Sequence, residues 1–142
     1  MLVKDMMSTK IVSVSPEETA AVAARLLARH NVGVLPVCTA EGKLRGVITD
    51  RDIILRCIAA EEDPNKMKVS EMMTRRVISV EPQENARVAT DLMAREKIRR
   101  LPVEEHGKLV GIVSLGDFAA MPDFTTEAAE ALCEISSNLK KT

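Results

Sequence analysis

Residues 46–52 read Gly-Val-Ile-Thr-Asp-Arg-Asp, and residues 111–117 read Gly-Ile-Val-Ser-Leu-Gly-Asp. Each stretch is a short apolar run ending in a hydroxyl residue, Thr49 or Ser114, with a carboxylate three positions later, Asp52 or Asp117. The apolar run predicts a strand, and the hydroxyl predicts the start of a helix. A hydroxyl and a carboxylate at this spacing form a helix capping box, but at the end of a strand they can also bind a nucleotide. For either stretch alone, both interpretations remain open.

The two stretches belong to a duplication that spans most of the chain. Residues 4–37 laid on residues 70–103, at an offset of 66, are identical at 15 of 34 positions. Beyond the Leu-Pro-Val triplets the offset falls to 65, so the second copy lacks one residue in the following turn. The charged, proline-containing link at residues 61–66 marks a boundary. We therefore expect repeats at residues 1–62 and 63–121, followed by a C-terminal helical extension at residues 122–142.

Each copy is predicted to contain the same elements in the same order. Ser15, Pro16 and Glu18 indicate a helix start of the capping-box type, and apolar residues keep helical spacing to about residue 30. Apolar runs at residues 34–38 and 44–49 predict a hairpin, and a second helix should occupy about residues 50–60. In the second copy the helix, hairpin and helix are expected at about residues 83–96, 100–114 and 115–120. The fold class is therefore α/β, with a small sheet packed with two helices in each repeat.

The residues after position 121 do not repeat. Thr125 or Thr126 can cap a helix in this region. The apolar residues of that helix share one face: Ala128, Ala131, Leu132, Ile135 and Leu139. This face must be covered either by the rest of the chain or by a neighbouring subunit or partner protein.

Composition favours a soluble, cytoplasmic protein without a nucleic-acid or membrane partner. Twenty basic and 21 acidic residues give a formal net charge of -1, so no overall field attracts nucleic acid or anionic lipid. No apolar run approaches the roughly 18 residues of a membrane span. Cys38, Cys57 and Cys133 contain no C-x-x-C pair and fit reduced thiols. The phosphate-binding loops, zinc motifs and nucleophile elbow are missing, so we expect neither a metal site nor enzymatic activity.

In combination, the repeated residues resemble a tandem pair of cystathionine-beta-synthase (CBS) domains, also called a Bateman module. The resemblance covers about residues 1–121 and rests on Met6-Met7, Pro16, Leu35-Pro36-Val37, Gly46, Thr49, Asp52 and their partners in the second copy. It implies two repeats related by a pseudo-twofold axis, with two clefts for adenosine-containing ligands such as AMP, ADP, ATP or S-adenosylmethionine. It also implies a homodimer and a non-enzymatic regulatory role, such as energy sensing, in which the nucleotide is a regulatory ligand and no cofactor is required.

Carried over by position, the resemblance places five residues at each cleft. The first cleft would contain Ile11, Gly33, Val34, Thr49 and Asp52. The second cleft would contain Val77, Arg99, Arg100, Ser114 and Asp117. Adenine would lie against Ile11 and the strand at residues 33–34 in the first cleft, and against Val77 and the strand at residues 99–100 in the second. The aspartate of each cleft would accept hydrogen bonds from the ribose hydroxyls.

The two predicted clefts differ in charge. Arg99 and Arg100 stand where the first copy has Gly33 and Val34. An arginine can bind phosphate through two parallel donors, although two solvated arginines at a strand edge would give the same pattern. Asp50 adds a carboxylate beside the first site, where the second copy has leucine. We therefore expect the second cleft to bind the more strongly phosphorylated ligand.

One alternative function from another class remains open. The chain could be a structural or dimerisation scaffold whose clefts are vestigial and whose tail helix binds a partner protein. The sequence does not distinguish this scaffold from the nucleotide-binding module, because the same repeat would build both.

Overall fold

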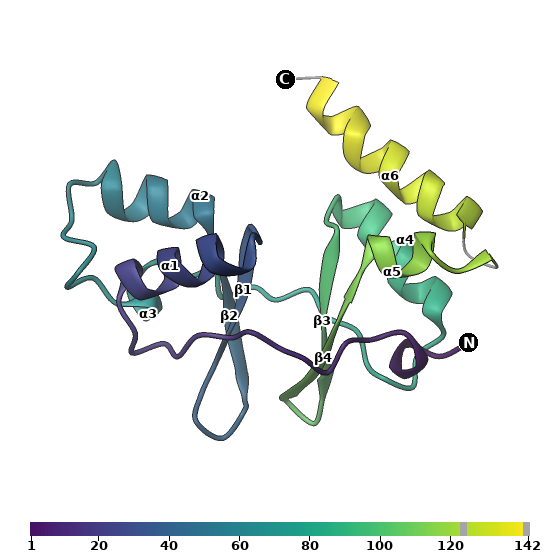
Figure 1. Cartoon of the computed structure of the whole chain (residues 1–142), viewed down its shortest axis with the longest axis horizontal. Helices are drawn as coiled ribbons and strands as arrows, with labels where there is room; N and C mark the ends of the chain where they lie inside the picture. The colour runs from purple at the N-terminus through teal and green to yellow at the C-terminus, as the bar shows by residue number, and fades with distance from the viewer. Residues whose placement is uncertain (123–124, 141–142) are drawn as a thin grey trace. The chain divides into compact units, whose positions relative to one another are not determined.

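The computed structural model describes residues 1–122 and 125–140, and for Thr125 and residues 137–140 it describes the backbone alone. The elements in chain order (Figure 1) are η1 (Val3–Asp5), α1 (Ala20–His30), β1 (Val34–Cys38), β2 (Leu44–Thr49), α2 (Asp50–Ile53), the π-helix η2 (Ile54–Ile58), α3 (Val69–Met72), α4 (Ala86–Glu96), β3 (Arg100–Glu105), β4 (Lys108–Ser114), α5 (Leu115–Ala119) and α6 (Thr125–Lys140). The predicted α/β class is confirmed, with a two-stranded sheet in each repeat and a C-terminal helix. None of the helices described is both long enough and apolar enough to cross a bilayer.

The two hairpins differ in their turns. β1 and β2 are antiparallel, with Val34 opposite Thr49, and their turn contains Gly42 at a φ of 85°. β3 and β4 are joined by His106 and Gly107, which both have positive φ, 54° and 80°. Positive φ at both central residues is the geometry of a tight two-residue hairpin turn. The second turn is therefore shorter, which accounts for the residue missing from the second copy.

The chain forms two compact units, and each unit combines parts of both sequence repeats. Unit 1 consists of Met1–Ile11, Ile78–His106 and Val110–Thr142. Unit 2 consists of Val12–Val77 and Gly107–Leu109. The N-terminal segment of the first copy thus packs in unit 1 with the second hairpin, and α3 of the second copy packs in unit 2 with the first hairpin. The units are composed differently from the consecutive segments 1–62, 63–121 and 122–142 that the repeat predicts.

The exchanged segments make matching hydrogen bonds in the two units. In unit 1 the amide of Val3 donates to the carbonyl of Glu84 at 2.8 Å. In unit 2 the residues 66 positions away do the same, because the amide of Val69 donates to the carbonyl of Glu18 at 2.8 Å. The exchange is therefore reciprocal, and each copy contributes the same backbone groups to the other copy's unit.

The exchanged segments also determine where the long helices begin. The amide of Ala20 donates to the carbonyl of Met67 at 2.8 Å, and the amide of Ala86 donates to the carbonyl of Met1 at 2.9 Å. Since these amides are bonded outside their helices, α1 and α4 begin at Ala20 and Ala86, and the starts expected near residues 15 and 83 are wrong. The N-caps are Thr19 and Asn85.

Each unit has its own hydrophobic core. The buried core of unit 2 contains Val14, Ala20, Ala23, Leu27, Leu35, Val37, Ile48, Ile53, Cys57, Val69, Met72 and Met73. The buried core of unit 1 contains Val3, Val80, Ala86, Ala89, Met93, Leu101, Val103, Val113, Leu115, Phe118, Ala128, Ala131 and Ile135. Met6 and Met7 are half-buried against the core of unit 1. Both methionine pairs therefore act as core filler, one pair in each unit.

The C-terminal helix α6 packs against α4 and α5 of unit 1 (Figure 1). Three residues of its apolar face are buried there: Ala128, Ala131 and Ile135. The ammonium group of Lys97, at the end of α4, donates to the carbonyl of Glu134 at 3.1 Å and lies 3.8 Å from its carboxylate. The sequence left open whether this apolar face is covered by the same chain or by another protein. In the structure it packs against the same chain. Leu132 remains 42% exposed, and the side chain of Leu139 lies outside the described part.

Candidate functional site

Both repeated hydroxyl-carboxylate pairs form capping boxes. In unit 2 the amide of Thr49 donates to the carboxylate of Asp52 at 3.0 Å, and the amide of Asp52 donates to the Thr49 hydroxyl at 2.9 Å. In unit 1 the corresponding distances between Ser114 and Asp117 are 3.0 Å and 3.3 Å. The capping interpretation is confirmed. A cap can also contact a ligand, so a ligand-binding role for these residues remains a prediction.

Asp52 has further protein partners that bear on this role. Its side chain is buried, and the hydroxyl of Thr74 lies 3.3 Å from both carboxylate oxygens. The guanidinium Nε of Arg56 lies 3.9 Å from the same carboxylate. Asp117 is only half-buried, and the residue that matches Thr74 in unit 1 is Ser8. A ribose at Asp52 would therefore compete with Thr74 and Arg56 for the carboxylate oxygens.

A backbone hydrogen bond joins the start of each hairpin to the helix that follows it. In unit 1 the amide of Leu115 donates to the carbonyl of Arg99 at 2.8 Å. In unit 2 the amide of Asp50 donates to the carbonyl of Gly33 at 3.2 Å. This bond places the residue just before the first strand beside the helix start, so the repeat brings Arg99 close to Ser114 and Gly33 close to Asp50.

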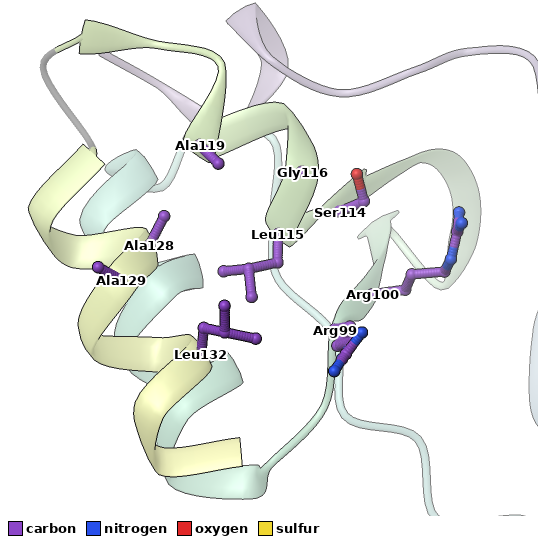
Figure 2. A pocket seen from close by; sticks show the side chains of 9 residues that line it. All are labelled: Arg99, Arg100, Ser114, Leu115, Gly116, Ala119, Ala128, Ala129 and Leu132. Carbon is purple, nitrogen blue, oxygen red and sulfur yellow. The ribbon is translucent and has the colours of Figure 1, made fainter. Parts of the chain in front are cut away.

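Unit 1 contains a cavity of about 510 Å³ at this place (Figure 2). Its volume lies within the range of roughly 300–1,000 Å³ that is usual for small-molecule sites. Three of the five residues predicted for the second cleft line it: Arg99, Arg100 and Ser114. Asp117 is not among the lining residues, and Val77 belongs to unit 2. The cavity is therefore an anion-binding candidate with two guanidinium groups and a hydroxyl at its edge.

Five lining residues were not predicted for this site. They are apolar and come from α5 and α6: Leu115, Ala119, Ala128, Ala129 and Leu132. The sequence signal was the apolar face of the tail helix, but this signal does not say which surface the helix covers. Gly116, in the first turn of α5, also lines the cavity.

Unit 2 contains an apolar groove of about 320 Å³ between α1 and α2, which correspond to the helices α4 and α5 that α6 packs against in unit 1. Its lining residues are Ala24, Leu27, Ala28, Val32, Asp50, Ile53 and Ile54. Ala24 is exposed here, whereas Thr90, its counterpart on α4 in unit 1, is 1% exposed. The charge at this place is also reversed between the units. In unit 2 the carboxylate of Asp50 lies beside Gly33, 3.8 Å from where a Cβ on that residue would be, whereas the counterpart of Gly33 in unit 1 is Arg99. Of the residues predicted for the first cleft, Ile11 belongs to unit 1.

Comparison with known proteins gives a consistent result. The CBS domain model matches residues 3–58 and 69–121. CBS domain-containing protein YhcV of Bacillus subtilis is 44% identical over 134 residues, which cover 94% of each chain. The crystal structure of Hypoxic Response Protein I with two coordinated zinc ions aligns with a TM-score of 0.77 at 32% identity, over 86% of this chain and 100% of that one. In the residues that the structure describes, no three His, Cys, Asp or Glu side chains gather as a metal site.

A further solved structure contains adenosine compounds. The CBS domain pair of protein MJ0100, in complex with 5′-methylthioadenosine and S-adenosyl-L-methionine, aligns with a TM-score of 0.69 at 32% identity, over 84% of this chain and 97% of that one. The family model and these relatives cover both sequence repeats, in the order that the duplication predicts. The chain therefore belongs to the CBS domain family and contains a tandem pair of CBS repeats.

Proposed function

We propose that this protein is a non-enzymatic regulatory module that binds a phosphorylated adenosine ligand, such as AMP, ADP or ATP, at the cavity of unit 1. The observation that carries the proposal is that Arg99, Arg100 and Ser114 all line that cavity. The related MJ0100 pair, crystallised with two adenosine compounds, supports the ligand class.

The charges at the cavity favour an anion. Two arginines line it, and none of the described residues that line it is acidic. The Ser114 hydroxyl oxygen accepts from the amide of Asp117, which leaves its hydrogen to donate to a phosphate oxygen. Both arginines are exposed, so water screens their attraction and the contact must be direct to contribute much.

The groove of unit 2 favours a different ligand. Asp50 lines it, and Asp52 lies in the cap that follows. The carboxylate of Asp50 repels a polyphosphate, so we propose that this unit takes an uncharged or cationic adenosine compound, of which S-adenosylmethionine is an example. The two sites would then share a plan without sharing a ligand.

Titration calorimetry with ATP tests the proposal directly. The Arg100→Ala variant should bind ATP about ten- to a hundredfold more weakly, because a hydrogen bond to a charged group contributes roughly 1.5–3 kcal/mol. Arg87→Ala is the matched control, since it removes the same charge from an exposed position on α4 that does not line the cavity. Equal weakening by both variants would show a general charge effect and count against the site.

Signalling would follow from a population shift. A ligand can favour one arrangement of the protein only to the extent that it binds this arrangement more tightly than the alternatives. A thermal shift assay with AMP, ADP, ATP and S-adenosylmethionine distinguishes the module from the scaffold. A shift with any of them supports the module, whereas no shift with all four supports a scaffold.

Self-association is a second proposal, and an apolar patch on η2 favours it. Ile54, Leu55 and Ile58 are 57%, 49% and 54% exposed, and they lie within five residues. Clustered exposed apolar side chains are typical of protein interfaces. We propose that this patch contributes to a homodimer. In sedimentation experiments Ile58→Glu should shift the protein towards monomer, while Val88→Glu, at a 44% exposed position on α4, should not.

A further inference from the structure

We infer that α6 forms one wall of the ligand site in unit 1, so that the ligand must join an anionic group to an apolar group and its binding holds α6 in place. This inference rests on the proposed function and assigns a role to a helix that lies beyond the matched CBS segments, which end at residue 121.

The cavity has two chemically different sides. Figure 2 shows Leu115 and Leu132 pointing towards each other, with Ala128 and Ala129 on the same side of α6. Arg99, Arg100 and Ser114 lie on the side away from α6. An inorganic phosphate or a sugar phosphate would contact only the polar side. A nucleoside phosphate can reach both sides, with its base on the apolar side.

Leu132 is the residue on which this inference depends most. Its neighbours on the apolar face of α6, Ala128, Ala131 and Ile135, are 4%, 1% and 7% exposed, whereas Leu132 is 42% exposed at the edge of the cavity. The packing of α6 therefore leaves one large apolar side chain uncovered beside the arginine site. A bound base would cover it and remove apolar surface from water.

The same contact would couple the ligand to the seating of α6. Besides three small or medium apolar side chains, α6 is held by the contact between Lys97 and Glu134. A ligand that touches both Arg100 and Leu132 binds fully only when α6 is seated. By mass action, bound ligand then shifts the equilibrium towards the packed position of α6. The equilibrium constant changes by about the ratio of ligand concentration to dissociation constant.

Calorimetry on the full chain with two probes, AMP and ribose 5-phosphate, tests the apolar wall. The Leu132→Ser variant should bind AMP about fivefold more weakly, since it removes a partly exposed apolar contact. It should bind ribose 5-phosphate as the unchanged protein does. Val88→Ser, at a 44% exposed apolar position on α4 that does not line the cavity, is the control and should change neither affinity. Unchanged AMP affinity in Leu132→Ser would overturn the inference.

Hydrogen exchange measures the coupling to α6. At about 100 times the dissociation constant, AMP should slow those α6 amides that exchange through helix release by up to about a hundredfold, with no matching change in α1. Unchanged exchange in α6 at saturating AMP would refute the coupling. If α6 of the Leu132→Ser variant already exchanges rapidly in the absence of ligand, the Ala129→Phe variant tests the α6 wall in its place. This change narrows the cavity from α6, and it should abolish AMP binding while ribose 5-phosphate still binds.

The two proposals fail in distinguishable ways. If none of AMP, ADP and ATP binds the unchanged protein, the proposed phosphate site in unit 1 fails and this inference fails with it. If Arg100→Ala weakens AMP binding but both α6 variants bind AMP normally, the arginine site stands and the α6 wall is refuted.

Discussion

Replacing Gly46 by alanine should destabilise the protein much more than replacing its counterpart Gly111. A Cβ on Gly46 would lie 2.6 Å from the backbone carbonyl oxygen of Thr74 and 3.2 Å from the sulfur of Met73. The Thr74 carbonyl is fixed, because it accepts from the amide of Val47 at 2.9 Å while the Thr74 amide donates to the Val47 carbonyl at 2.8 Å. Relieving the clash therefore requires the two segments to separate.

The situation at Gly111 is milder. A Cβ there would meet Met7, at 2.5 Å from its sulfur, 2.9 Å from Cγ and 3.1 Å from Cβ. A half-buried methionine side chain can change rotamer and move most of these atoms away. The same substitution in the same motif therefore meets fixed backbone in unit 2 and an adaptable side chain in unit 1.

The expected magnitudes follow from these contacts. Gly46→Ala should lower the unfolding free energy by about 3 kcal/mol, from overpacking strain and the weakening of two backbone hydrogen bonds. Gly111→Ala should cost about 1 kcal/mol. For a chain of this size these values correspond to a fall of about 10 °C and about 3 °C in melting temperature.

Circular dichroism melts of the two variants measure the difference. Gly111→Ala should cost less in a Met7→Ala background than in the unchanged protein, because the two nearest contacting atoms, Sδ and Cγ of Met7, are then absent. Adding Met73→Ala should not rescue Gly46→Ala, because the Thr74 backbone remains in place. Equal melting temperatures for the two alanine variants, or a rescue by Met73→Ala, would refute the reasoning.

Three further predictions concern single positions. Gly116→Ala should raise the unfolding free energy by about 0.5–1 kcal/mol, because a Cβ there meets nothing closer than 3.8 Å, yet weaken AMP binding in calorimetry by narrowing the cavity. The exposed thiol of Cys133 should react with a disulfide reagent at neutral pH at least about tenfold faster than Cys38 and Cys57, because burial raises the pKa of those two thiols. Peptide mass spectrometry measures the order in which the three cysteines react. Asp52→Ala should cost about 2 kcal/mol in urea unfolding and Asp117→Ala about 1 kcal/mol, because only Asp52 also binds Thr74 and Arg56; equal losses would contradict this.

The local patterns predicted the hairpins well and the helix starts poorly. Strand limits at Val34, Cys38, Leu44 and Thr49 agree with the apolar runs, because the turn residues that bound each strand are adjacent to it in the sequence. Helix starts depend on which amides find partners. Here the partner of Ala20 is a carbonyl nearly fifty residues away, which no capping pattern near residue 15 can indicate.

The candidate site shows the same division. Arg99, Arg100 and Ser114 were predicted together because the resemblance to CBS domain pairs assigns them to one cleft by position, and in the structure all three line one cavity. Leu132 could not be predicted there, because the apolar stripe of a helix gives its face but not the surface that it meets. The ligand roles of all these residues stay predictions.

The reciprocal exchange of segments affects how the chain is assembled. Nearly all of unit 2 lies within Val12–Val77, so this unit can close while the rest of the protein is still being synthesised. Residues 1–11 are made first, yet the residues they pack with begin at Ile78, so they wait longest for their partners. Cutting the chain in the link at residues 61–66 would leave two fragments that each carry a segment belonging to the other. Neither fragment would therefore contain all the residues of a complete unit.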